Sequence, residues 1–477
     1  MPLTDLAHFV KQPAKFDCLK QPEVLVLESL EASTFHIIAL IIFICAILHT
    51  LSVHKIHNWA RELERKGSHD RAHKHRHRSG LVQTLYFLSE VEIVFGVWVI
   101  PLFLVITYFY GRSIALDYIN TRDYTEALFV VVILVLTGTR PIVRLAERLT
   151  AQIAKMLGNS VSAWWVTLLT IGPVLGSFIT EVGSMALIAL LLGRQFYKHH
   201  PSQKLAYATI ALLFVNVSVG GILTNFASPA VLILSHSWHW TNTDVFLDFG
   251  WKAILGILLS NFVYRLYFHK EFTHLNNKHK ATGSTFTQLS HESAKPIPLW
   301  VTTVNILFIV WSVATSHYPA IFIASFILFL GFYHSTRIHQ YALHLIRPMM
   351  VGLFLAGLVI HGGLQGWWVI TIFQKLSPLG VMGMAMSLTA FNDNASISYL
   401  ATLIPDWGHL YQYAVFTGVV AGGGLTVIAN APNPAGYFIL KKYFDKGINP
   451  IKLFVAALIP TLILYAIFFF FGPVTFS

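Results

Sequence analysis

Asp393 is the residue of this sequence best suited to hold an ion. It lies in the segment "FNDNAS" (391–396), and apolar residues dominate on both sides of that segment. A carboxylate in such surroundings needs a compensating charge, and the chain has no Lys or Arg between Lys375 and Lys441. A cation or a proton can compensate it, and a carboxylate that holds one or the other couples their exchange. Because carboxylate, amide and hydroxyl oxygens are ligands of hard cations, the segment predicts a cation and proton site.

Glu181 is the second candidate acid. It lies within the apolar segment "GSFITEVGSMALIALLL" (176–192). Either acid could instead form a structural ion pair with a distant Lys or Arg. Ionisable groups inside a membrane mark functional sites by default, so we expect Asp393 first, and Glu181 second, to exchange protons for a cation.

The composition is typical of a helical membrane protein. Apolar residues make up 55% and charged residues 12% of the 477 residues, and the mean hydropathy is +0.61. A soluble chain of this length carries more charge, and several apolar stretches could cross the roughly 30 Å of hydrocarbon in a bilayer. The first of them begins at Phe35, too late for a signal peptide. The two cysteines, Cys18 and Cys45, predict neither a disulfide framework nor a metal site.

The net charge of +11 is concentrated in a few loops. Lys and Arg gather in residues 54–80, 265–295, 334–347 and 441–447. The positive-inside rule places these loops in the cytoplasm, whereas loops 236–244 and 316–319 have no Lys or Arg and are expected outside. The His-rich run "HDRAHKHRHR" (69–78) could bind a transition metal or sense pH. It could equally be a basic loop beside anionic lipid.

We expect about ten membrane crossings, which put every basic loop on one side with residues 1–34 outside. The expected crossings are 35–53, 82–110, 124–140, 204–238, 245–264, 298–315, 319–334, 348–361, 410–440 and 451–472. Two further apolar stretches, 160–193 and 369–404, are each split by polar residues. We expect these to be re-entrant hairpins, the first entering from the cytoplasm and the second from outside. The predicted fold class is an all-α polytopic membrane protein.

Two halves of the chain repeat the same motifs. Each has a hairpin with a polar tip, followed by a crossing broken at Gly-Gly-x-Leu-Thr, in "GGILTNFASPAV" (220–231) and "GGGLTVIANAPNPAG" (422–436). Phe178 corresponds to Phe391, an offset of 213, and Gly220 corresponds to Gly422, an offset of 202. Since the hairpins enter from opposite sides, the repeats are inverted. Such paired interruptions predict a transporter site near the middle of the bilayer.

The repeat also divides the chain into parts. We expect an N-terminal segment with the first crossing and the His-rich loop (1–80), a first repeat (81–264), a cytoplasmic linker (265–296) and a second repeat (297–477). The hairpins 160–193 and 369–404 belong to the first and second repeats, respectively.

The paired hairpins and Gly-rich broken helices resemble the ion transporter superfamily, which includes Na+/H+ antiporters, arsenite and citrate carriers, and dicarboxylate symporters. "FNDNAS" is similar to the Asp-Asn hairpin-tip motif of its Na+/H+ antiporter branch. The resemblance to a bacterial Na+/H+ antiporter family covers residues 80–472. In the first hairpin, aligned on Phe178, the sequence has Thr180 and Glu181 where that branch has Asp-Asn. The acidic group is therefore shifted by one residue.

The resemblance implies a secondary active ion transporter, foremost a Na+/H+ antiporter with alternating access around two hairpin tips. The candidate ion- and proton-binding residues are Thr180, Glu181, Ser184, Thr224, Asn225, Ser228, Asp393, Asn394, Ser396, Thr426, Asn430 and Asn433. Na+ and H+ are then the transported ions, and we expect no cofactor and no metal other than transported Na+. Relatives are commonly dimeric, so a homodimer in the bilayer of a bacterial inner (plasma) membrane is expected.

Two alternatives stay open. An anion or dicarboxylate symporter of the same superfamily would use the positive ends of half-helices, whereas two acids at the tips favour a cation. A non-transporting membrane sensor is the other alternative, with the His-rich loop as its sensor-like feature. The chain has no Walker motif, nucleophile elbow or HExxH motif, so we do not expect an enzyme. Membrane topology also explains the basic loops better than nucleic-acid binding does.

Overall fold

The computed structural model describes residues 22–69, 80–281, 296–343, 345–444 and 447–473. Every regular element in these ranges is a helix. Cys18, nearly all of the His-rich run 69–78 and residues 282–295 of the linker lie outside the described residues. The predictions made for them therefore stay predictions.

Among the described residues, five helical segments are long and apolar enough to cross a membrane. They are Thr34–Val53, Val161–Ile179, Gln203–Gly220, Asn242–Tyr267 and Pro450–Phe471. Two bent pairs raise the number to as many as seven: Thr125–Thr137 with Arg140–Met156, bent by 65°, and Ile346–Gly362 with Gly366–Phe373, bent by 79°. The helices are those of a membrane protein, whereas the count of ten crossings stays a prediction.

The helices before the first hairpin are α2 (Pro22–His69), α3 (Gly80–Leu88), α4 (Val94–Tyr110), α5 (Arg112–Asn120), α6 (Thr125–Thr137) and α7 (Arg140–Met156). The crossing predicted over 82–110 is not one continuous helix, because the short turn η1 (Val91–Ile93) separates α3 from α4. The Ser89 hydroxyl donates to the Tyr86 carbonyl at 2.8 Å. Such a bond competes with the helical pattern and helps to end α3.

The two hairpins and the two broken helices follow the same order along the chain. The first set is α8 (Val161–Ile179), α9 (Glu181–Gln195), α10 (Gln203–Gly220) and α11 (Pro229–Ser237). The second set is α19 (Pro378–Phe391), α20 (Asn394–Thr402), α21 (His409–Gly422) and α22 (Asn433–Leu440). The gaps between α10 and α11 and between α21 and α22 confirm the interruptions predicted from the Gly-Gly-x-Leu-Thr motifs.

The second hairpin begins later than predicted, at Pro378 and not at residue 369. Residues 369–373 belong to α18 (Gly366–Phe373), which is bent away from α17 (Ile346–Gly362). Ser377 then caps α19, because its Oγ accepts the N–H of Gly380 at 3.2 Å. The sequence signal for this break is the polar stretch Gln-Lys-Leu-Ser-Pro (374–378), in which Ser377 and Pro378 form a typical helix start.

Small residues let the helices of each half pack closely. In the first hairpin, a Cβ at Gly172 would lie 2.6 Å from Ile188 Cγ1, so α8 and α9 touch along their length. In the second half, a Cβ at Gly418 of α21 would lie 2.3 Å from the Met382 carbonyl oxygen of α19. Larger side chains at these glycines would separate the helices that carry the polar tips.

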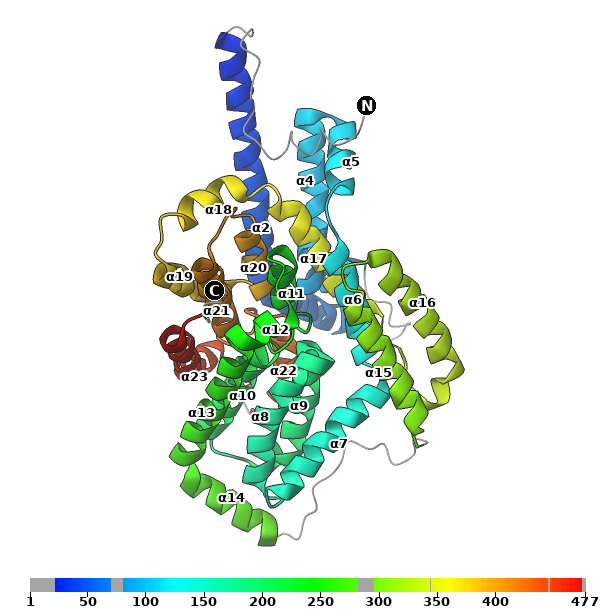
Figure 1. Cartoon of the computed structure of the whole chain (residues 1–477), viewed down its shortest axis with the longest axis vertical. Coiled ribbons are helices and arrows are strands. Elements are labelled where there is room, and N and C mark those ends of the chain that lie inside the picture. The colour runs from blue at the N-terminus through cyan, green and yellow to red at the C-terminus, as the bar shows by residue number, and fades with distance from the viewer. Residues whose placement is uncertain (1–21, 70–79, 282–295, 344, 445–446, 474–477) are drawn as a thin grey trace.

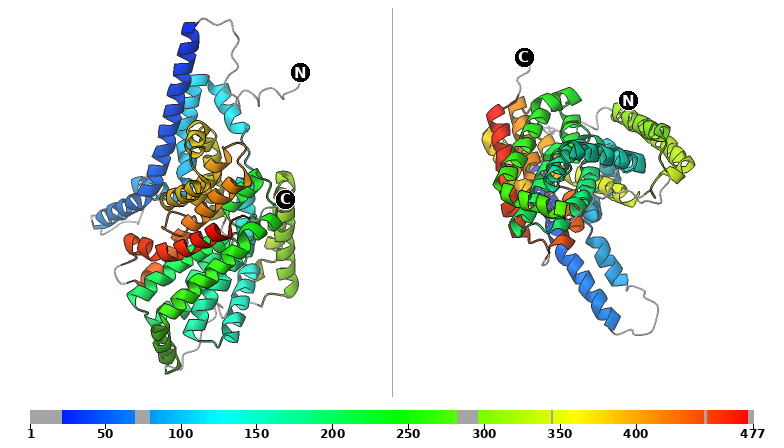
Figure 2. Two further views of the ribbon diagram at one scale, coloured as in Figure 1. Left: turned by 60° about the vertical axis from the view of Figure 1, so that its left-hand side comes forward. Right: turned by 90° about the horizontal axis from the view of Figure 1, so that it is seen from below.

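The remaining helices are α12 (Asn242–Val245), η3 (Phe246–Gly250), α13 (Trp251–Tyr267), α14 (His269–Ala281), α15 (Leu299–Ala314), α16 (Pro319–Ser335) and α23 (Pro450–Phe471), with the short helical turns η2 (Tyr197–His199), η4 (Arg337–His339) and η5 (Lys441–Tyr443). Figure 1 shows α8, α9 and α14 in the lower part of the molecule and α18, α19 and α20 above them, with α15 and α16 along one side. In the side view of Figure 2, α2 projects beyond the rest of the molecule.

Candidate functional site

Each hairpin tip is hydrogen-bonded to the interruption of a broken helix. The N–H of Glu181, the first residue of α9, donates to the Ala227 carbonyl at 3.3 Å, and the N–H of Asn394, the first residue of α20, donates to the Ala429 carbonyl at 3.0 Å. The two donors are 213 residues apart and the two acceptors are 202 apart, which are the offsets of the sequence repeat. The first N–H groups of a helix lack partners within it, and the interruptions provide them.

The threonines of the Gly-Gly-x-Leu-Thr motifs make a second pair of corresponding bonds. Thr224 Oγ1 donates to the Ser177 carbonyl and Thr426 Oγ1 donates to the Ala390 carbonyl, both at 2.8 Å. Both acceptors lie at the end of the first helix of a hairpin. The two hydroxyls therefore hold the interruptions against the tips.

Glu181 reaches from the first hairpin to the second interruption. Its side chain is buried, and its Oε2 accepts a hydrogen bond from Asn430 Nδ2 at 3.0 Å. Within the described part of the chain, Glu181 Oε1 and Asn430 Oδ1 have no hydrogen-bond partner. A Cβ at Gly221 would lie 2.4 Å from Glu181 Cγ, so the first interruption packs against the Glu181 side chain. The carboxylate lies between both interruptions with one oxygen unpaired.

Asp393 occupies the N-cap position of α20. Its Oδ1 accepts the N–H of Ala395 at 2.9 Å, and the amide of Ala431 in the second interruption also interacts with the carboxylate. Asp393 is buried, and it is close enough to Glu181 for the two carboxylates to repel each other. The N–H groups at the start of α20 thus compensate part of the negative charge of Asp393, for which the sequence predicted a cation or a proton.

The shift of the acid by one residue in the first tip has a clear structural consequence. Thr180 corresponds to Asp393, and its Oγ1 accepts the N–H of Gly183 at 3.4 Å and caps α9. Glu181 corresponds to Asn394, whose Nδ2 has no partner and would lie 3.4 Å from a Cβ at Gly423. In the second tip the acid, Asp393, is the N-cap residue, whereas in the first tip the acid, Glu181, is the residue that follows the N-cap.

Three predicted residues bond to the backbone and not to the acids. Ser184 Oγ donates to the Gly172 carbonyl at 2.8 Å, Asn225 Nδ2 donates to the Trp240 carbonyl at 3.1 Å, and Asn433 Nδ2 donates to the carbonyls of Gly423 and Thr426 at 2.8 Å. These side chains stabilise the first hairpin and the interruptions.

Ser228 and Ser396 lie with the acids. Ser228 is buried beside Glu181, and Ser396 is buried in the first turn of α20, where its N–H donates to the Asp393 carbonyl at 3.1 Å. Among the described residues, neither hydroxyl oxygen has a hydrogen-bond partner within 3.5 Å, and the Ser228 hydroxyl is close enough to the Glu181 carboxylate to interact with it. Both are therefore available to a ligand.

The alternative of a structural ion pair has no support in the part of the chain that the structure describes. There, neither Asp393 nor Glu181 pairs with Lys or Arg. A buried cation that the sequence analysis missed is Lys252 of α13, whose Nζ donates to Tyr413 Oη at 3.2 Å and to the Gly472 carbonyl. The signal for it was a single Lys in the apolar run "FGWKAILGILL" (249–259).

A comparison with protein families matches residues 34–471 to the family described as "Putative Na+/H+ antiporter". The chain belongs to this family. The resemblance drawn from the hairpin tips is thereby confirmed, and the match covers nearly the whole chain. A search of curated proteins finds no match. Membership of the antiporter family indicates an ion transporter and not an enzyme, and the apolar helices place it in a membrane.

In this antiporter-family chain, several buried oxygen atoms close to the acids have no hydrogen-bond partner among the residues that the structure describes. They are Glu181 Oε1, Asn430 Oδ1, Ser228 Oγ and Ser396 Oγ. A buried polar atom without a partner is costly, and carboxylate, amide and hydroxyl oxygens suit a hard cation. The arrangement can therefore hold Na+ or protons between the two tips.

Proposed function

We propose that the chain is a secondary Na+/H+ antiporter in which Asp393 and Glu181 exchange Na+ for H+. The observation that carries the proposal is the meeting of two buried carboxylates, one from each hairpin tip, at Asn430 and Ala431 of one interruption. Without a Lys or Arg partner, their charge calls for a cation or a proton. Because both ions use the same oxygens, binding of one displaces the other and couples the two gradients.

We further propose that the site is reached from each side of the membrane in turn, through an inverted repeat. The common order of helices and the corresponding hydrogen bonds support this. The repeats are residues 81–264 and 297–477, joined by the linker 265–296 and preceded by residues 1–80. Movement of one repeat against the other then exposes the site alternately.

The proposed roles of the polar residues follow from their contacts. The proposed ion ligands are Asp393, Glu181, Asn394, Ser396, Asn430 and Ser228. The residues proposed to hold the tips and interruptions in place are Thr180, Ser184, Thr224, Asn225, Thr426 and Asn433. This division predicts that only the first set changes ion selectivity.

A dicarboxylate symporter is the second candidate, because helix N-termini at both tips suit an anion. In this structure Asp393 already occupies the N-terminus of α20. A substrate carboxylate would therefore meet a like charge, which favours the cation.

We also propose that the protein works as a homodimer in the inner membrane of a bacterium. Large apolar side chains are exposed on α15 and α16, including Leu307 at 60% and Leu328 at 69%. Such surfaces suit lipid or a second copy of the chain. Chemical cross-linking in isolated membranes distinguishes a dimer from a monomer.

A pH-sensitive dye in proteoliposomes tests the transport activity directly. Purified protein is reconstituted in vesicles with an acidic lumen, and Na+, Li+, K+ or a dicarboxylate is added outside in turn. We expect Na+ to drive protons out of the lumen and empty vesicles to show no response. Uptake of a labelled dicarboxylate without any Na+-dependent proton movement would contradict the proposal and support the symporter.

A further inference from the structure

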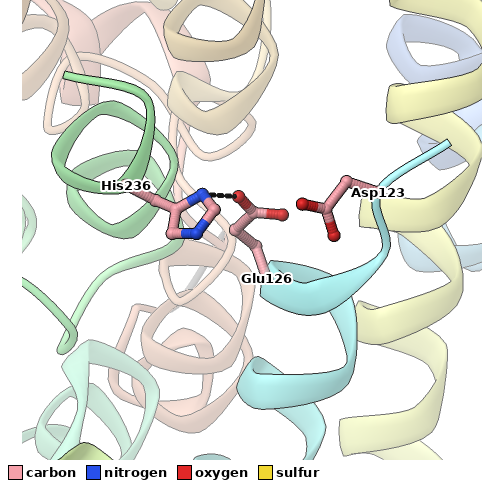
Figure 3. A group of neighbouring side chains, drawn as sticks. All are labelled: Asp123, Glu126 and His236. Atoms are coloured by element: carbon pink, nitrogen blue, oxygen red, sulfur yellow. Dashed lines mark ion pairs between the residues drawn. The ribbon is translucent and has the colours of Figure 1, made fainter. Parts of the chain in front are cut away.

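Asp123, Glu126 and His236 form a group of metal-ligating side chains that the proposed ion site does not use (Figure 3). Asp123 lies just before α6, Glu126 lies in its first turn, and His236 lies near the end of α11. His236 Nδ1 and Glu126 Oε1 are 2.6 Å apart. One ligand atom from each of the three residues lies within 4.8 Å of the others.

Within the part of the chain that the structure describes, His236 is the only basic residue paired with an acid of this group. Among the described residues, no Lys or Arg forms an ion pair with Asp123 or Glu126. The neighbouring Arg122 is turned toward Tyr118, since its Nε donates to the Tyr118 carbonyl at 3.2 Å and its guanidinium lies 4.5 Å from the centre of that ring. Two carboxylates beside an imidazole are a ligand set that attracts a divalent cation, which would displace any proton from the imidazole.

A second imidazole lies next to the group. The ring of His317, in the turn between α15 and α16, stacks on His236 with 5.1 Å between ring centres and 18° between planes. Two imidazoles and two carboxylates suit transition metals, whereas Ca2+ and Mg2+ prefer oxygen ligands alone. Asp123 and His317 are exposed, and Glu126 and His236 are half-buried, so a metal ion can enter from solvent.

We propose that Asp123, Glu126 and His236, with His317 beside them, bind a divalent transition-metal ion. Zn2+ is the ion used to test the site. Zn2+ takes oxygen and nitrogen ligands at about 2.0–2.2 Å. The ligand atoms must therefore move closer together than they lie in the structure. The exposed carboxylate of Asp123 can do so by rotation, because only its Oδ1 is fixed, by the N–H of Thr125 at 2.9 Å.

A metal ion here would join segments that are separate in the chain. It would tie the start of α6 to the end of α11 and to the turn between α15 and α16. Since α11 is the second half of a broken helix, a bound metal would restrain the part of the molecule that follows the first interruption. The binding itself does not depend on transport, so it can be tested whether or not the protein exchanges Na+ for H+.

Equilibrium dialysis of the full-length protein against Zn2+ in detergent tests the site. The wild type is compared with Asp123→Asn, Glu126→Gln and the control His239→Asn, which removes an imidazole from the same turn as His236. The chain has 23 His residues, and other sites can also bind Zn2+. The Zn2+ ion bound at this site is therefore measured as the difference in bound Zn2+ between the wild type and each variant. We expect each acid variant to lose one bound Zn2+ or to bind it more than about 10-fold more weakly, and the control to match the wild type.

Because Asp123 is exposed, we expect Asp123→Asn to fold normally, so it tests the site even if Glu126→Gln folds poorly. Gel filtration of each variant confirms that it is folded before dialysis. Equal Zn2+ content and affinity in the wild type and folded Asp123→Asn and Glu126→Gln would overturn the proposal. Loss of the same Zn2+ in His239→Asn would also overturn it, because the ion would then belong to another group of ligands.

Discussion

Replacing Asn430 with Ala removes the hydrogen bond between Asn430 Nδ2 and Glu181 Oε2, which is 3.0 Å long and buried. A hydrogen bond to a charged group contributes about 1.5–3 kcal/mol, and about 1.4 kcal/mol changes an equilibrium constant tenfold. The substitution also removes Asn430 Oδ1, an unpaired oxygen that we propose as an ion ligand. We therefore expect the apparent affinity for Na+ to fall about 10- to 100-fold.

A Na+ titration of proton efflux in proteoliposomes measures this change. The control is Asn305→Ala, because Asn305 is also a buried amide but its Nδ2 donates within α15, to the Val301 carbonyl at 2.7 Å. We expect the control to keep the half-saturating Na+ concentration of the wild type. An unchanged Na+ dependence in Asn430→Ala would refute the reasoning, because the second interruption would then not take part in ion binding.

Three further predictions address the packing, the topology and the pH dependence. Gly221→Ala should weaken Na+ binding about 5- to 100-fold, because its Cβ would lie 2.4 Å from Glu181 Cγ and relief of such overlap costs about 1–3 kcal/mol. Cysteines at Ser68 and Ser284 should react with impermeant reagents only from the cytoplasmic side. Burial, assisted by Lys198, lowers the pKa of His199 to about 4 from its usual 6.5. The folded state therefore favours neutral His199, whereas the unfolded chain takes up a proton as the pH falls below 6.5. Thermal stability of the wild type should therefore fall between pH 6.5 and 4, and His199→Gln should lose less stability over the same range.

Each of these predictions has a control and an outcome that contradicts it. Gly383→Ala controls for the glycine change, since its Cβ would meet only Tyr465 Oη at 3.8 Å; equal Na+ affinity in both glycine variants would show that Gly221 does not shape the site. Labelling of either cysteine from outside intact cells would break the topology and the inverted repeat. Identical pH profiles for His199→Gln and the wild type would show that His199 does not govern this loss of stability.

The interruptions and the hairpin tips could be predicted because their signals are local. Gly220 and Gly422 end α10 and α21, and Pro229 begins α11. Proline is favoured at the first position of a helix, because an N–H group there would make no hydrogen bond within the helix. Asp393 was recognised from its polar neighbours in an apolar run. Its capping of α20 was within reach as well, since Asp before a helical segment is a common N-cap.

The contacts between the halves could not be predicted from one sequence. Asn430 and Glu181 are 249 residues apart, and no spacing in the chain indicates that their side chains meet. The shared offsets identified corresponding residues, but they could not show that Glu181 of one tip reaches the interruption of the other half. The break of α3 and α4 at Ser89 was missed for a related reason, because hydropathy alone does not register a hydroxyl that ends a helix.

Sodium-driven proton movement in Asp393→Asn proteoliposomes tests the central claim most directly. Asn is also a good N-cap residue, so the substitution keeps the cap of α20 while it removes the charge and the exchangeable proton. Asp117→Asn, an exposed site on α5, is the matched control. We predict no Na+-dependent proton movement in Asp393→Asn and wild-type movement in Asp117→Asn. Exchange at the wild-type rate by Asp393→Asn across about pH 6–9, the range that a buried carboxyl group can reach, would contradict the claim.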